Sequence, residues 1–316
     1  MVDDRNPGYR ELLCELYPHT GRAWVLGVTG NPGSGKSTLC DRLIQRFRAR
    51  GERVGVVAVD PTSPFSGGAI LGDRIRMQRH FEDDQVFIRS VATRGAVGGL
   101  SRSAADLVRV LDAWGAATVL LETVGVGQDE LDVIRAAHTT LVVMAPGLGD
   151  DVQAIKAGIL ECADVFAVNK ADREGADLTV RDLELMLALG AEVLGGTQPK
   201  SRGHSAAQSA PQPAFEGFTP AIVKTVATRD EGIDELVDKL EAHRRWLETT
   251  DAGRERRSLR LHEQLVAFLR DVLAEQAVST LGPAISEAAE RIAARQIDPY
   301  AACDELIARF RRDSTP

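Results

Sequence analysis

One run of eight residues constrains the fold of this chain more than any other feature, because it matches the pattern G-x-x-x-x-G-K-[ST] at every fixed position. The run comprises Gly30, Asn31, Pro32, Gly33, Ser34, Gly35, Lys36 and Ser37. An apolar run at 23–29 precedes it, and apolar residues at helical spacing follow it, namely Leu39, Leu43 and Phe47. The sequence therefore predicts a buried strand, a glycine-rich loop and an amphipathic helix, in that order.

A loop of this composition binds the phosphates of a nucleotide through its backbone. Glycine reaches the conformations that point successive N–H groups inward, and the start of the helix adds the positive end of its dipole. We expect Lys36 to act in catalysis by bridging the β- and γ-phosphates, and the Ser37 hydroxyl to coordinate Mg²⁺. Nucleotide contacts are expected along the whole run from Gly30 to Thr38.

Short apolar runs alternate with helical patterns from about residue 23 to residue 245. Several of these runs are continuously hydrophobic, which is typical of strands buried on both faces of a parallel sheet. The alternation predicts an α/β fold with a doubly wound, mostly parallel sheet, in which ligands bind at the carboxyl ends of the strands. The predicted strands are 23–29, 53–59, 86–90, 117–122, 139–145, 164–169 and 221–226.

The composition changes outside this alternation. Residues 1–22 are predicted to form a short N-terminal helical segment, and residues 23–247 are predicted to form the P-loop domain. Within that domain, residues 191–218 are rich in Gly, Ser, Gln and Pro and lack periodicity. We interpret them as a flexible surface insertion.

The C-terminal part, residues 248–316, has helical periodicity only. Apolar stripes at 261–272, 285–292 and 303–310 predict three short helices. Asp298 is expected to cap the last of them, with Pro299 at its first helical position. Packing against the chain's own domain and dimerisation with a second copy fit this pattern equally well.

Three carboxylates stand at predicted strand ends or in the loops beside them, where a phosphate-bound Mg²⁺ needs oxygen ligands. They are Asp60, Asp73 and Glu122, and we assign Glu122 a catalytic role as well. Glu122 also opens an E-x-x-G element, and the N–H of its glycine, Gly125, can contact the γ-phosphate.

A second nucleotide motif lies at the end of the strand predicted at 164–169, where Asn169, Lys170 and Asp172 form the pattern N-K-x-D. A carboxylate at Asp172 can accept hydrogen bonds from N1–H and N2–H₂ of guanine, and adenine offers neither donor there. Asn169 is expected to tie this loop to the phosphate loop, with the stem of Lys170 over the base. Val226 and Ala227 occupy the place of a Ser-Ala element, and Ala227 is expected to offer its N–H to the base. The sequence thus predicts GTP and GDP as ligands.

The residue after Gly125 is Val126, where many switch GTPases carry the glutamine that orients the attacking water. Valine cannot orient water. We therefore expect slow intrinsic hydrolysis, with Gln128 or a rearrangement induced by a partner supplying the missing function.

Bulk properties exclude several classes of protein. The net charge of −8 argues against binding to nucleic acid or to anionic membranes. Four widely spaced cysteines without nearby histidines argue against a zinc or iron–sulfur site and fit a reducing compartment. Because the acidic N-terminus does not resemble a signal peptide and no apolar run reaches the length of a membrane span, we expect a cytoplasmic protein.

With these motifs assembled, the chain resembles the methylmalonyl-CoA mutase-associated GTPases (MeaB, also called ArgK) of the SIMIBI class of P-loop proteins. The resemblance covers about residues 23–247. Its distinctive parts, in addition to the two nucleotide motifs, are the segments 57–77, 122–130 and 146–161.

This resemblance implies a homodimeric, Mg²⁺-dependent GTPase that acts as chaperone of an adenosylcobalamin-dependent acyl-CoA mutase, gating cofactor loading and reactivating the enzyme. It also implies mobile loops around 60–77, 122–130 and 146–156 that report the nucleotide state to the mutase. Gln153 and Lys156, in the last of these loops, are candidate signalling residues.

Two alternatives remain open. A GTPase of the same class that assembles nickel centres would need a His-rich or Cys-containing metal site, and the sequence supplies none. A P-loop kinase linked to amino-acid transport would not need Asn169 and Asp172. The 191–218 insertion and the altered Ser-Ala element depart from the family pattern and bear on the partner more than on the nucleotide.

Overall fold

The computed structural model describes most of the chain, with the exceptions of the two ends and five internal stretches. The described residues are 8–60, 77–92, 99–123, 136–147, 162–195 and 217–313. They fall into two compact units, residues 1–260 and 261–316.

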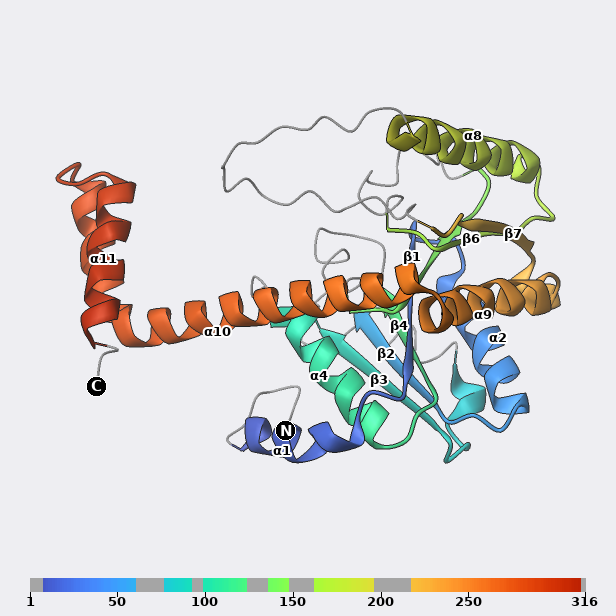
Figure 1. The fold of residues 1–316 in the computed structure, drawn as a ribbon, viewed down its shortest axis with the longest axis horizontal. Helices are drawn as coiled ribbons and strands as arrows, with labels where there is room; N and C mark the ends of the chain where they lie inside the picture. The colour runs from blue at the N-terminus through green and yellow to red at the C-terminus, as the bar shows by residue number, and fades with distance from the viewer. Residues whose placement is uncertain are drawn as a thin grey trace. The chain divides into compact units, whose positions relative to one another are not determined.

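The first unit is built around a seven-stranded sheet in which every pairing is parallel, with the order β3-β2-β4-β1-β5-β6-β7 (Figure 1). All seven strands lie where the sequence predicts them, and the predicted fold class is confirmed. The strands are β1 (Trp24–Gly30), β2 (Val54–Asp60), β3 (Val86–Ala92), β4 (Thr118–Thr123), β5 (Thr139–Met144), β6 (Val165–Asn169) and β7 (Ala221–Thr225).

Helices cover both faces of this sheet. The helices of the first unit, with three short 3₁₀ segments, are α1 (Tyr9–Leu16), η1 (Tyr17–His19), α2 (Lys36–Ala49), η2 (Gln78–His80), α4 (Gly99–Ala113), α8 (Ala176–Gly195), η3 (Ala227–Arg229) and α9 (Ile233–Thr249). α8 continues to Gly195, so its last turn enters the segment predicted as a flexible insertion, and residues 196–216 lie outside the described part.

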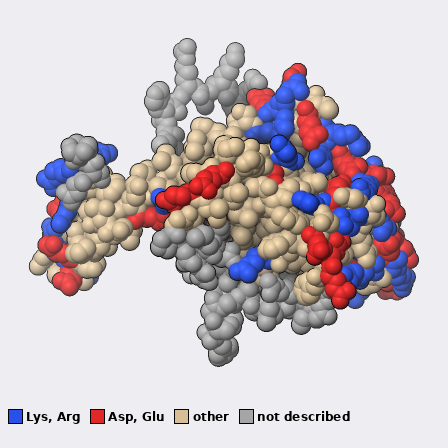
Figure 2. All heavy atoms as spheres, turned by 90° about the horizontal axis from the view of Figure 1, so that it is seen from below, with Lys and Arg blue, Asp and Glu red and all other residues tan. Residues whose placement is uncertain are grey.

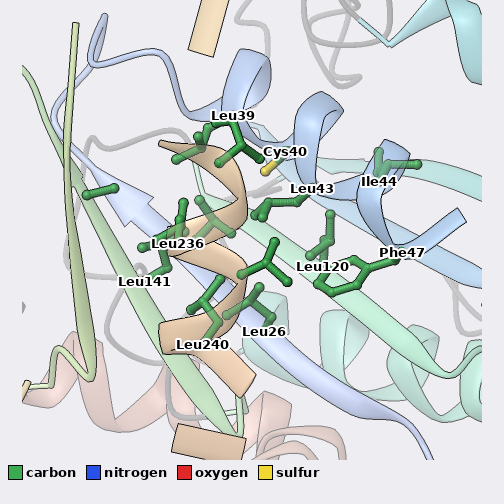
Figure 3. Packing of buried hydrophobic residues seen from close by; sticks show 14 of the residues in the cluster. Leu26, Leu39, Cys40, Leu43, Ile44, Phe47, Leu120, Leu141, Leu236 and Leu240 are labelled. Carbon is green, nitrogen blue, oxygen red and sulfur yellow. The ribbon is translucent and has the colours of Figure 1, made fainter. Parts of the chain in front are cut away.

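Alternating side chains of the strands build a core on each face. On one face, Leu26 of β1 and Leu120 of β4 pack with Leu43 of α2 and Leu236 of α9 (Figure 3). On the other face, the next residues along the same strands, such as Val25, pack under α4, and residues of β5 and β6 pack under α8. Each fully buried aliphatic side chain contributes ~1.5–3 kcal/mol to the stability of the folded state. These two layers therefore hold the strands in place and with them the strand ends.

In the strand order of the sheet, β1 lies at the point where the connections between successive strands change direction across the sheet. Its neighbours are β4 on one side and β5 on the other, both joined to it in parallel. In open parallel sheets, ligands bind outside the carboxyl ends of the strands at such a point. The glycine-rich loop leaves the sheet there.

A buried ionic network holds the first residues of α10 (Asp251–Ala293) against the sheet. Arg256 donates from Nη2 to Asp164 Oδ1 at 2.5 Å, and Asp164 also accepts from the Thr140 N–H at 2.8 Å. Burial alone would raise the pKa of Asp164, but the cationic groups beside it, Arg256 and Arg260, hold the pKa below its usual value. Burial also lowers the pKa of His243, which lies beside Asp164, to about 4, so this imidazole is neutral at pH 7.

The C-terminal part corrects one prediction. α10 runs without interruption over 43 residues, so the first two predicted helices form one helix with Pro283 inside it. Proline removes one backbone donor, and the helix continues because the apolar and helix-forming residues on both sides of Pro283 outweigh that loss. The prediction for the last helix, α11 (Pro299–Asp313), is confirmed, since Asp298 Oδ1 accepts from the N–H groups of Tyr300 and Ala301 at 2.9 and 3.1 Å.

Candidate nucleotide-binding site

The loop between β1 and α2 has a backbone that only glycine allows at two positions. Gly30 has φ 134°, and a Cβ built there would lie 1.9 Å from the carbonyl oxygen of Val143. Gly35 has φ 95°, and its Cβ would lie 2.4 Å from Nδ2 of Asn169. Both glycines therefore serve close approach, to the neighbouring strand in one case and to the N-K-x-D motif in the other.

Lys36 and Ser37 open α2 and are both buried. The ammonium group of Lys36 donates to the carbonyl oxygens of Gly30 and Asn31 at 2.7 and 3.1 Å. These bonds fold the side chain back over its own loop, where an ammonium group can also meet phosphate oxygens.

The hydroxyl of Ser37 donates to Oε1 of Glu122 at 2.7 Å. Glu122 lies on β4 opposite Val28 of β1 and is only 3% exposed. A hydroxyl and a carboxylate side by side are hard oxygen donors, and this donor set suits Mg²⁺. Of the other predicted metal ligands, Asp60 is the last residue of β2 and its side chain is not described, and Asp73 lies outside the described residues.

Asn169, the last residue of β6, joins the two nucleotide motifs. Its Nδ2 donates to the carbonyl oxygen of Ser34 in the glycine-rich loop at 2.8 Å. Its Oδ1 accepts from the N–H of Ala227 at 3.1 Å and from the hydroxyl of Thr225 at 3.3 Å. The side chain is 2% exposed. One amide thus holds the phosphate loop, the end of β6 and η3 together.

Lys170 and Asp172 follow Asn169. Lys170 has a left-handed backbone, φ 58°, and its ammonium group donates to the carbonyl oxygen of Gly33 at 2.6 Å. Partial burial, followed by the charge of Arg173, lowers the pKa of Lys170. The Asp172 side chain is one-third exposed, and its Oδ2 lies 3.3 Å from Nη2 of Arg229.

The segment after β7 bends back on itself. Val226 exchanges backbone hydrogen bonds with Glu231, and η3 lies within this turn. The Ala227 N–H, for which we expect a contact with the base, donates to Oδ1 of Asn169. A role in base binding would therefore require this N–H to be shared between two acceptors.

Several other residues named by the sequence analysis belong to the part of the chain that is not described. Gly125, Gln128, Gln153 and Lys156 lie outside the described residues, as does Val126. Sequence reasoning missed Arg229, which belongs to no motif, although it lies two residues after Ala227.

Fold and site together define a class. A parallel sheet with a glycine-rich loop at its switch point, joined through Asn169 to an N-K-x-D motif, is the arrangement of a P-loop protein specific for guanine nucleotides.

Comparison with known proteins gives the family. The family described as methylmalonyl-CoA mutase-associated GTPase MeaB matches residues 1–282, and the chain belongs to it. The protein is a GTPase of this family.

Individual relatives agree with this assignment. A protein of Pyrococcus abyssi that is named as a GTPase is 45% identical over 308 residues, covering 97% of this chain and 89% of that protein. The mouse protein named methylmalonic aciduria type A homolog, mitochondrial, is 32% identical over 231 residues, covering 73% of this chain and 51% of that protein.

A crystal structure described as that of a LAO/AO transport system kinase has the same fold. It superposes with a TM-score of 0.64 at 22% identity and covers 97% of this chain and 89% of that one. Within the described part of the chain, no group of three or more His, Cys, Asp or Glu side chains could hold a metal ion. None of the helices searched in that same part is long and apolar enough to cross a bilayer.

Proposed function

We propose that this chain binds GTP and Mg²⁺ at the site built around Lys36 and Asn169, and that it uses GTP hydrolysis to control an adenosylcobalamin-dependent acyl-CoA mutase. The observation that carries the nucleotide part is the pair of bonds from Asn169 to Ser34 and Ala227, because they bring a phosphate loop and a base loop into one site.

In this proposal, different residues of the site contact the phosphates, the metal ion and the base. The ammonium group of Lys36 exchanges its carbonyl partners for oxygens of the β- and γ-phosphates and offsets charge that develops there. Ser37 and Glu122 would hold Mg²⁺, which when bound neutralises phosphate charge. Asp172 accepts from N1–H and N2–H₂ of guanine, and the stem of Lys170 covers the base.

The mutase part of the proposal draws on the family name and on the name of the mouse relative. Slow hydrolysis without a partner suits a protein whose bound nucleotide is read by another enzyme, and Val126 in place of a water-orienting glutamine supports it. All four cysteines are free, which fits a reducing compartment, and we propose a cytoplasmic location.

Replacing Asp172 by asparagine should change the base that the site selects. The amide introduced by D172N, when it presents its NH₂ group, would oppose the N–H donors of guanine and suit the C2 carbonyl of xanthine. We expect GTP affinity to fall by ~10²-fold or more and XTP affinity to rise. Titration calorimetry with GTP, XTP and ATP measures both changes.

The matched control is Asp177→Asn, because Asp177 lies five residues further on, in the first turn of α8, and pairs with Lys224. It should bind all three nucleotides as the parent does. A D172N protein that kept the parent's GTP affinity would contradict the assignment of Asp172.

Hydrolysis by the isolated protein should be slow and should accelerate with the mutase. A single-turnover assay, run with and without purified mutase from the same organism, tests this, together with pull-down in the presence of GDP or a non-hydrolysable GTP analogue. Lys36→Ala should abolish the nucleotide dependence of the pull-down. Fast hydrolysis by the isolated chain, or mutase binding that ignores the nucleotide, would contradict the proposal.

We also propose that α10 mediates a homodimer. Several large apolar side chains on it are exposed, and much of the surface of residues 261–293 seen in Figure 2 is neither acidic nor basic. Leu261, Leu265 and Leu269 repeat every four residues along the helix and are 69%, 65% and 54% exposed. A face of this kind is typical of helix pairing between chains.

Light scattering should give the parent twice the chain mass of 34.1 kDa. Leu265→Glu should give the monomer, because it places a charge in the apolar face. The control is Leu185→Glu on α8, where the leucine is 61% exposed, and it should leave the mass unchanged. A monomeric parent, or a dimer that persists in L265E, would contradict α10 as the interface.

A further inference from the structure

Three arginines spaced four residues apart lie along helix α2, which begins with the phosphate-loop residues: Arg42 and Arg46 within the helix, and Arg50 at its C-cap. Residues at this spacing lie on one side of a helix. Each of the three binds a group in the segment from η3 to α9. No nucleotide motif includes them.

Arg42 binds the backbone of η3. Its Nε donates to the carbonyl oxygen of Ala227 at 2.9 Å, and its Nη2 lies 3.5 Å from the carbonyl oxygen of Thr228. The side chain is 19% exposed. Two successive carbonyls therefore face one planar guanidinium, whose fork of donors suits such a pair.

The other two arginines bind carboxylates further along. Arg46 pairs with Asp230 at 2.8 Å and with Asp234 at 2.6 Å, and Arg50 pairs with Glu241 on α9. The pair with Asp230 reaches the residue that ends η3, and the pairs with Asp234 and Glu241 reach α9. Exposure rises along the series, since Arg42 is 19%, Arg46 23% and Arg50 42% exposed.

The contact of Arg42 lies within the proposed base site. Both backbone polar groups of Ala227 are hydrogen-bonded, because its carbonyl oxygen accepts from Arg42 and its N–H donates to Asn169. Two residues later, Arg229 pairs with Asp172. A shift of η3 would therefore disturb the acceptor on Asn169 and the cation beside Asp172 together.

We propose that Arg42 is a positioning residue for guanine recognition, acting through η3. Its guanidinium fixes η3 to the helix that carries the phosphate loop, so the base-selecting side chains keep a set position relative to the phosphates. This inference rests on the proposed function, because it assumes that guanine meets Asp172 and that the phosphates meet Lys36.

A purely structural role for Arg42 has a different signature. Loss of a helix contact would weaken every nucleotide alike, since the phosphate loop and the base loop would both loosen. Loss of a positioning contact at η3 would weaken the guanine contacts and leave the phosphate contacts in place. The ratio of GTP to ATP affinity separates the two roles.

The test compares Arg42→Ala, Arg42→Lys and Arg50→Ala by equilibrium titration with GTP and ATP. In R42A, GTP affinity should fall ~10-fold while ATP affinity stays within about twofold of the parent's, so the ratio falls. R42K should lie between R42A and the parent, because lysine keeps the charge and loses the fork of donors. R50A keeps the η3 contacts and should match the parent.

Several outcomes overturn the inference. Equal losses of GTP and ATP affinity in R42A would assign Arg42 a structural role. GTP and ATP affinities that both stay at the parent's values would remove any role in base selection. If R42A does not fold, R42K decides by the same ratio. A parent that does not prefer GTP over ATP would refute the proposed function and this inference together, whereas a GTP-to-ATP ratio in R42A that equals the parent's refutes only the inference.

Discussion

Asn169 has a buried amide whose two ends are both engaged, and the candidate site depends on it. Its Nδ2 donates to Ser34 in the phosphate loop, and its Oδ1 accepts from Ala227 and Thr225. Ser34 and Asn169 are 135 residues apart in the chain. A buried amide that lost these partners would carry a desolvation cost of ~1–3 kcal/mol, so each loop stabilises the position of the other. Glycine at position 35 is part of the same constraint, because a side chain there would collide with this amide.

The sheet makes this contact possible. β1 and β6 both run parallel to β5, which lies between them, so their carboxyl ends reach the same edge. Helix α2, which follows β1, links this edge of the sheet to η3. α2 carries Lys36 and Ser37 at its start and Arg42 further along, so one rigid element touches both the phosphate loop and η3. The fold thus sets the distance between a site for phosphates and a site for a base.

Much of this could be predicted from sequence, for a physical reason. Parallel strands buried on both faces are continuously apolar, which located the central strands, and the alternation of short apolar runs with helical patterns located the others. A phosphate loop needs glycines and lysine at fixed spacing. The contact between Asn169 and the phosphate loop also follows from the motif. These features are local in the chain or are tied to a short pattern.

Other features could not be predicted, either because one local signal outweighs another or because they depend on tertiary contacts. The continuity of α10 through Pro283 depends on the residues around the proline and not on the proline itself. The bond from the Ala227 N–H to Asn169 depends on how η3 packs, and the motif alone suggests a different acceptor. Arg42 and Arg229 contact backbone and carboxylate groups far away in sequence, and only the regular spacing of the arginines on α2 indicates a shared partner.

The most direct test of the account is the nucleotide affinity of an Asn169→Ala protein. The substitution removes the links to Ser34 and Ala227 without touching Lys36 or Asp172. We predict that the protein remains folded, as judged by circular dichroism, and that GTP and GDP affinities fall by ~10²-fold, which corresponds to the loss of about two buried hydrogen bonds. Binding of both nucleotides at the parent's affinity would contradict the claim that Asn169 builds the site.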